Sequence, residues 1–287
     1  MGPAVSAVVP TFRPDTQALV SLVAALESVG VPVLVADDAS PCTYDPVLRD
    51  AAALGAGVVR HRDNAGIARS LNAGCRFADA LGARWLLTVD QDSQLPAGYV
   101  TGLVDAMEEA HAALGEGRVG AVAAGSITDT SGDIGYRITQ VAGVPTTPEV
   151  IQTGTLWNVA CLEGIGGFDE GFGIDAVDAA ACVRLRAAGS HIVVAPEVAI
   201  GHHLGDARQV QVLGRTVLAT GHSPERRTTI LRNRLRLAPE EFRQSPAHAF
   251  RTLRRVAVGT ALAVTVEDDR WPKAKAAVRG LLPRRDG

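Results

Sequence analysis

Four short apolar segments, at residues 5–9, 31–36, 58–61 and 85–89, constrain the fold of this chain most strongly. Stretches with helical spacing lie between them, at 16–29 and in the segment that runs through Ala80. An order of strand, helix and strand is typical of a parallel sheet covered by helices. Because such strands are buried on both faces, they read as nearly continuous apolar runs. We therefore predict an α/β fold with a Rossmann-like, mostly parallel central sheet flanked by helices.

Polar side chains follow three of these predicted strands. Asp37 and Asp38 end the second run, Asn64 follows the third, and Asp90 and Asp92 follow the fourth. In open α/β sheets, ligands bind at the edge formed by the carboxyl ends of the strands. The placement therefore predicts a ligand site that is lined by acids.

The triplet Asp90-Gln91-Asp92 points to the chemistry of that site. Two carboxylates separated by one residue can reach one hard cation, and Mg²⁺ or Mn²⁺ sites commonly combine one or two carboxylates with substrate phosphates and water. Such a cation would neutralise charge that develops on a departing diphosphate. Taken alone, this triplet is also common in surface turns. Its position at a strand end, behind two similar strand-end sites, is what favours a metal site.

Other polar residues allow two interpretations each. Asp37 could accept hydrogen bonds from a nucleoside, or it could be a turn residue or helix N-cap. Asp175 and Asp178 are three residues apart, so they should share one face of a beginning helix, where one could act as a general base or both could offset the helix dipole. His202, which follows an apolar run at 193–199, could be a metal ligand or a structural histidine.

The middle and end of the chain are less regular. We expect a helix at 99–114, strands and loops at 119–150, a strand at 154–160, a glycine-rich loop at 163–173, a helix at 176–188 closed by Gly189, and a strand at 191–195. Beyond Gly201 we expect basic helices punctuated by Pro224, Pro239 and Pro246.

Composition excludes some classes of partner and location. The net charge of -3 gives no general attraction to nucleic acid. The four cysteines have no paired spacing, and neither a signal peptide nor an apolar run of 18 residues is apparent, so we expect a cytoplasmic protein. Residues 250–283 mix apolar side chains and arginines at helical spacing. They could contact the inner face of the plasma membrane, pack on the catalytic domain, or contact another copy of the chain in a homo-oligomer.

Several motifs also resemble a known family. VVPTFRP, VADDAS, NAGIARSLNAG and TVDQDS, in this order, resemble the inverting family-2 glycosyltransferases, which have the GT-A fold. GIGGFDEGFGIDAVDAAACVRLRAAG, GHHLGD and HSPERRTTILRNRLRL resemble the bacterial rhamnosyltransferase branch of that family. The resemblance covers about the first 240 residues. It implies a catalytic domain at 1–240, with a nucleotide-binding half at 1–115 and an acceptor-binding half at 116–240, followed by a helical segment at 241–287.

The resemblance implies a metal-dependent transfer of one sugar, L-rhamnose from dTDP-rhamnose, to a hydroxyl of a cell-surface glycan, a lipid-linked acceptor or a small molecule. It assigns Asp178 as the general base, Asp92 and His202 as ligands of Mn²⁺ or Mg²⁺, and Trp157 and Asp175 to the acceptor. The residues that it assigns to the nucleotide-sugar are Pro10, Thr11, Asp37, Asn64, Gly66, Ala68, Asp90 and Arg227.

The chain also departs from the family pattern. Val177 stands where many relatives carry an acid before the base, Ala180 stands near the place of another acid, and Arg69 replaces a small residue. Other functions stay open at this point: a transferase of galactofuranose or a hexose from a UDP-sugar, a nucleotidyltransferase, or a nucleotide-sugar-binding module without catalysis. The nucleotidyltransferase is disfavoured because PTFRP, rather than a glycine-rich basic loop, follows the first strand.

Overall fold

The computed structural model describes residues 4–129, 132–201, 208–212, 215–219, 221–267 and 269–282. These residues divide into two compact units. The first comprises the described residues of 4–129 and 133–201, and the second comprises Gly132 and the described residues from 208 onward.

The first unit is built on one ten-stranded sheet, in the order β3-β2-β1-β4-β9-β5-β10-β8-β7, with β6 paired to β5. Four strands from the amino-terminal half are parallel neighbours: β1 (Val5–Thr11), β2 (Val33–Asp37), β3 (Gly57–Arg60) and β4 (Trp85–Thr88). All four coincide with the predicted apolar runs. The α/β prediction is therefore confirmed.

The other half of the sheet is mixed. β9 (Thr155–Asn158) runs antiparallel between β4 and β5 (Val119–Asp129), whereas β10 (His191–Gly201) is parallel to β5. The short strands β6 (Gly132–Gly135), β7 (Thr139–Val141) and β8 (Val144–Thr146) complete it. Because β9 is antiparallel to β4, the residues just before β9 lie next to the end of β4, close to the loop that contains Asp90.

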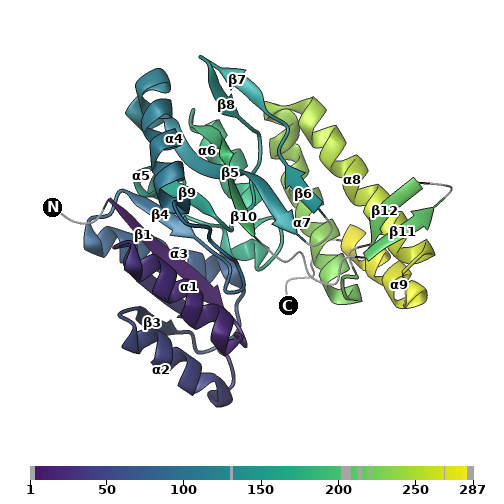
Figure 1. Ribbon diagram of the computed structural model, residues 1–287. Coiled ribbons are helices and arrows are strands. Elements are labelled where there is room, and N and C mark those ends of the chain that lie inside the picture. Colours follow the sequence, from purple (N-terminus) through teal and green to yellow (C-terminus); the bar gives the residue numbers. More distant parts are fainter. Residues whose placement is uncertain are drawn as a thin grey trace. The chain divides into compact units, whose positions relative to one another are not determined.

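Six α-helices and three 3₁₀ turns accompany the sheet within the described residues of the first unit. The helices are α1 (Thr16–Ser28), α2 (Asp45–Ala53), α3 (Ile67–Leu81), α4 (Tyr99–Leu114), α5 (Val159–Gly164) and α6 (Val177–Ala187). The turns are η1 (Cys42–Tyr44), η2 (Glu116–Arg118) and η3 (Glu170–Phe172). In Figure 1, α1 and α4 lie in front of the sheet and α3 lies behind it, packed against β1, β2 and β4. The helices therefore bury both faces of the central strands, which explains why the side chains of these strands are apolar on both faces.

One predicted site residue belongs to the core of this unit. The side chain of Trp157 on β9 is fully buried, its indole N–H donates to Thr88 Oγ1 at 2.9 Å, and its ring meets Phe168 edge-on. The acceptor contact predicted for Trp157 stays a prediction, and in this structure the side chain packs inside the core. It fastens β9 to β4.

The second unit contains the hairpin β11 (Arg208–Val212) and β12 (Arg215–Ala219), followed by helices α7 (Pro224–Gln244), α8 (Pro246–Thr265) and α9 (Arg270–Leu281). α7 packs against both α8 and α9. The helices expected beyond Gly201 are therefore present, and α7 and α8 begin at the predicted Pro224 and Pro246, but two strands that were not predicted precede them. Residue 240 lies inside α7, and the predicted functional boundary there stays a prediction.

Pro239 does not end a helix, contrary to the prediction. α7 continues through it, and Leu237 and Ala238 next to it are buried. Proline removes one backbone hydrogen bond, and burial of the neighbouring side chains offsets that loss.

Charged side chains also hold the second unit together. Glu267 is buried and accepts from Arg227 Nη2 at 2.7 Å and from Lys273 Nζ at 3.0 Å. Burial alone would raise the pKa of Glu267, but the Lys273 hydrogen bond and the positive charges of Arg227 and Lys273 lower it. The carboxylate therefore stays ionised between its two partners. None of the described helices is both long enough and apolar enough to cross a bilayer.

Candidate active site at the carboxyl edge of the sheet

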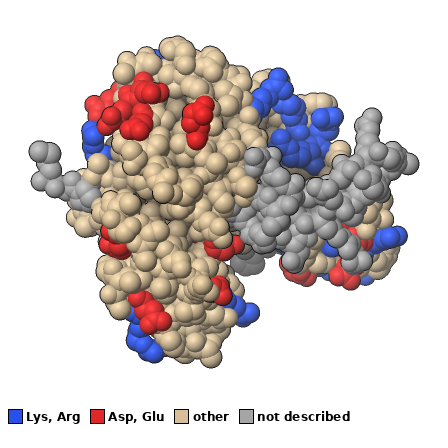
Figure 2. Space-filling model, in the orientation of Figure 1, with Lys and Arg blue, Asp and Glu red and all other residues tan. Residues whose placement is uncertain are grey.

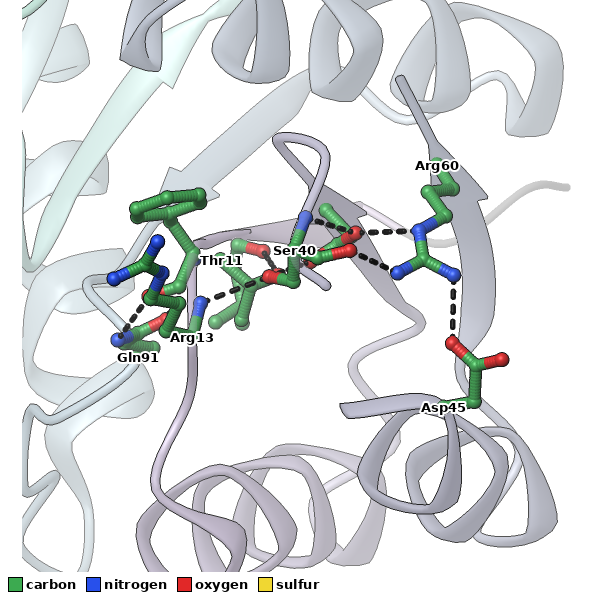
Figure 3. Close-up of polar contacts among 9 residues, drawn as sticks. Thr11, Arg13, Ser40, Asp45, Arg60 and Gln91 are labelled. Atoms are coloured by element: carbon green, nitrogen blue, oxygen red, sulfur yellow. Dashed lines mark hydrogen bonds and ion pairs between the residues drawn. The ribbon is translucent and has the colours of Figure 1, made fainter. Parts of the chain in front are cut away.

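The loop that follows β1 is fastened to the Asp90–Asp92 loop by one side chain. Gln91 Oε1 accepts from the Phe12 N–H at 2.9 Å, and Gln91 Nε2 donates to the Phe12 carbonyl at 3.2 Å. Arg13, which has a positive φ of 51°, donates its backbone N–H to Ser40 Oγ at 2.8 Å. Figure 3 shows Ser40 and Gln91 on the two sides of this loop. The loop is thus held from both sides.

Asp37 organises the next loop from inside the protein. Its carboxylate accepts from the backbone N–H and the hydroxyl of Ser40, and it lies 3.1 Å from Arg60 Nε. A hydrogen bond to Asp45, together with the charges of Asp37 and Asp45, raises the pKa of Arg60. Asp37 is fully buried in this arrangement. Figure 3 shows Ser40 and Arg60 side by side, with Asp45 on the far side of Arg60. Its predicted contact with the nucleobase stays a prediction.

Asp38 holds the glycine-containing turn after β3. Its two carboxylate oxygens accept from the backbone N–H groups of Ala65, at 3.0 Å, and Gly66, at 2.8 Å. Gly66 has a φ of 93°, and a Cβ atom there would lie 2.6 Å from the Gly173 carbonyl oxygen. Only glycine suits this position, because it combines a positive φ with a close backbone approach. The close approach is to the Gly173 loop.

Helix α3 holds the same loop at a second point. Asn72 accepts from the Phe168 N–H and donates to the Phe168 carbonyl, both at 2.9 Å. Ala68 is fully buried, and its N–H donates to the Gly173 carbonyl at 3.4 Å, so it can offer a ligand little but backbone. Arg69 pairs with Asp63 at 2.9 Å. These contacts connect the turn after β3 to the loop before α6.

The Asp90–Asp92 loop is fastened to the segment before β9. The Asp90 N–H donates to Thr153 Oγ1 at 2.8 Å, Thr153 Oγ1 contacts Ser93 Oγ at 2.9 Å, and Gln152 Nε2 donates to Asp90 Oδ1. Asp90 is half-buried and Asp92 is exposed. An exposed carboxylate next to a half-buried one fits a hard cation that keeps water and takes phosphate oxygens.

Asp178, the predicted base, lies in the first turn of α6. Its Oδ1 accepts from the Ala179 N–H at 2.7 Å, and its Oδ2 accepts from the Gln152 N–H at 3.3 Å. Asp175 precedes the helix, and Ala176 between them has a φ of 64°. Burial, with the nearby Asp178 charge among the further causes, raises the pKa of Tyr136, so that phenol stays protonated.

The remaining predicted site residues are spread over both units. Pro10 and Thr11 end β1, where Pro10 pairs in register with Ala36. Asn64 is exposed after β3. His202 lies outside the described residues, but the preceding Gly201 forms a backbone bridge with Gln94, two residues after Asp92. Arg227 belongs to the second unit, in the Glu267 network.

Hydrogen bonds thus connect the acids at this edge in one series. Asp37 contacts Ser40, Ser40 contacts the loop after β1, Gln91 ties that loop to Asp90 and Asp92, and Gln152 joins Asp90 to Asp178. The three predicted groups of acids therefore lie along one edge of the sheet.

Residues 6–157 match the family described as glycosyl transferase family 2. The chain belongs to this family.

A curated relative extends the likeness beyond the family match. The dTDP-rhamnosyl transferase RfbF of Shigella flexneri is 26% identical over 241 residues, which cover 79% of this glycosyltransferase and 77% of the relative.

Solved structures confirm the GT-A fold. TarS of S. aureus superposes with a TM-score of 0.60 at 17% identity, over 98% of this chain and 49% of TarS, so the glycosyltransferase spans about half the length of that protein. TarS 1-349 in complex with UDP-GlcNAc gives 0.58 at 17% identity, over 97% of this chain and 80% of that one. GalNAc-T7 with UDP, GalNAc and Mn²⁺ superposes with a TM-score of 0.58 at 13% identity, over 96% of this chain and 54% of GalNAc-T7.

Sequence reasoning missed the residues that hold the acids in place: Ser40, Arg60, Gln91, Gln152 and Thr153. Gln91 could have been noticed, since it stands between two predicted site acids. Gln152 and Thr153 carry no local signal, because their contacts to Asp90 join residues more than 60 positions apart.

Proposed function

We propose that this family-2 glycosyltransferase transfers L-rhamnose from dTDP-rhamnose to a hydroxyl of a cell-surface glycan or lipid-linked acceptor, with a divalent cation. The observation that carries the proposal is the series of contacts from Asp37 to Asp178 along one sheet edge. The name of the RfbF relative supports the choice of donor. A UDP-sugar donor is the second candidate, supported by the UDP-GlcNAc complex of TarS 1-349.

In this proposal the loops after β1 and β3 bind the nucleoside, and Asp92 faces the diphosphate. Asp178 takes the proton of the acceptor hydroxyl as that oxygen attacks the anomeric carbon. The bond from this carbon to the diphosphate oxygen breaks, and nucleoside diphosphate leaves from the opposite face. Because a single displacement occurs, the anomeric configuration inverts. Most of the acceleration comes from positioning and from stabilisation of the departing charge.

Asp92 would hold the cation, with Asp90 beside it, and the cation supplies Lewis acidity to the diphosphate when bound. The fit rests on an exposed carboxylate at the end of a strand, because a hard cation with oxygen ligands suits such a place. His202 would be a further ligand.

A donor panel tests the assignment. With Mn²⁺ present, dTDP-rhamnose should raise the melting temperature of the protein more than UDP-GlcNAc, UDP-galactofuranose or UDP-glucose, because a ligand that binds only the folded state stabilises it. Release of dTDP on addition of an acceptor fraction should follow. A larger shift with a UDP-sugar would move the assignment to that donor, and no shift with any nucleotide-sugar would reject it.

We also propose that α8 and α9 contact the anionic inner face of the plasma membrane, where a lipid-linked acceptor would be found. α8 has three arginines and no acid, and α9 has no acid and three basic residues besides Lys273, which is buried against Glu267. Figure 2 shows basic side chains gathered at one end of the α7 and α8 pair. Phe250 is 65% exposed and Trp271 is 71% exposed. Exposed aromatic side chains with surrounding positive charge are typical of helices that lie on lipid surfaces.

Flotation with vesicles tests this contact. The protein should bind vesicles that contain phosphatidylglycerol and not vesicles of phosphatidylcholine alone, and Phe250→Ser with Trp271→Ser should lower the bound fraction several-fold. Val29→Ser is the matched control, because Val29 is a similarly exposed apolar residue at the end of α1. Equal binding to both vesicle types, or by the double variant, would refute the contact.

A further inference from the structure

Gln152 is a buried residue to which neither the family motifs nor the proposed mechanism gives a role. It lies just before β9, in a segment fastened to the end of β4: Thr88 Oγ1 donates to the Gln152 carbonyl, and the Gly154 N–H donates to the Thr88 carbonyl at 2.7 Å. Gly154 has a φ of 72°, and a Cβ there would lie 2.3 Å from the Tyr99 hydroxyl. The backbone of this segment is therefore fixed.

From this position, Gln152 contacts the acids of both halves of the site. Its side-chain amide donates to Asp90 Oδ1, and its backbone N–H donates to Asp178 Oδ2 at 3.3 Å. A carboxylate can only accept, so the amide nitrogen must face Asp90. One residue thus connects the acid beside the predicted metal ligand with the predicted base.

The other end of the amide gives independent support. Gln152 Oε1 is buried and has no hydrogen-bond partner among the described residues. An apolar side chain of the same length would fill this space without leaving a buried acceptor unsatisfied, so core packing alone does not explain a glutamine here. The bond to Asp90 does explain it.

We infer that Gln152 is a positioning residue: its amide fixes the Asp90 carboxylate in the donor site, while its backbone holds Asp178 at a set place relative to that carboxylate. The inference rests on the proposed function. A neutral donor is needed here, because a third carboxylate would repel Asp90 and a methylene chain would leave Asp90 without this bond.

Calorimetric titration with Mn²⁺ and dTDP, or UDP if the wild type prefers it, tests the role without catalysis. Gln152→Met should weaken nucleotide binding about ten-fold, as loss of a group that orients a ligating residue commonly does. Gln152→Glu should weaken it further, although glutamate fills the same space. Gln140→Met is the matched control, since Gln140 lies exposed on β7, and it should bind as the wild type does.

A double variant separates positioning from general damage. In Gln152→Glu with Asp90→Asn, the donor and the acceptor of the pair exchange places, so this variant should bind no more weakly than Asp90→Asn alone. Additive losses, or Gln152→Met binding equal to that of the wild type, would overturn the role of Gln152 only. Wild-type protein that binds no nucleoside diphosphate would overturn the proposed function together with it.

Discussion

Replacement of Asp178 by asparagine should lower the rate of sugar transfer by about 10²–10⁴-fold, the usual contribution of a general base. The change keeps the size of the side chain, and the carboxamide oxygen can still accept from the Ala179 N–H. Nucleotide-sugar binding should therefore persist. Single-turnover measurement of transfer, combined with calorimetry of donor binding, gives both quantities on the same protein.

Asp79→Asn is a suitable control for this result, because this replacement removes the same charge at an exposed position near the end of α3. It should transfer sugar at the wild-type rate. If Asp178→Asn turned over normally, or lost donor binding while keeping its turnover, Asp178 could not be the base, and Asp175 would become the next candidate.

Replacement of Asp92 by asparagine should remove most of the metal dependence of donor binding. Loss of a group that merely orients a metal ligand costs about 10–100-fold, so loss of the ligand itself should cost at least as much. Titration of the nucleoside diphosphate with and without Mn²⁺ measures this as the ratio of two dissociation constants. The ratio should fall toward one in the variant.

The metal-free dissociation constant is the internal control. It should change little, because the exposed Asp92 repels a diphosphate weakly in water at physiological salt. An Asp92→Asn protein with an unchanged Mn²⁺ dependence would show that other residues bind the cation.

The fold of the amino-terminal half was predictable because its signal is local. β1, β2 and β4 are buried on both faces, so apolar side chains follow one another without alternation. The pairing of β11 with β12 and the passage of α7 through Pro239 were not predictable in this way. A helix that contains proline persists only when tertiary packing compensates, and the partners of α7 are α8 and α9.

The site was predictable to the same extent. Acids that directly follow strands can be located from sequence, because the carboxyl ends of parallel strands meet at one edge. Which acid is accessible depends on distant partners. Arg60 and Ser40 enclose Asp37, whereas Asp92 is exposed. Neither the VADDAS motif around Asp37 nor the TVDQDS motif around Asp92 indicates this difference in burial.

The backbone contact between Gly66 and Gly173 also limits how the two loops can be arranged. Because the two loops touch without intervening side chains, one cannot approach the other any further, and a displacement of either pushes on its neighbour. Any side chain larger than hydrogen at position 66 would therefore force the turn after β3 away from the loop that leads to Asp178. In the proposed function the donor binds against the first of these loops and Asp178 follows the second, so this glycine contact sets their nearest approach.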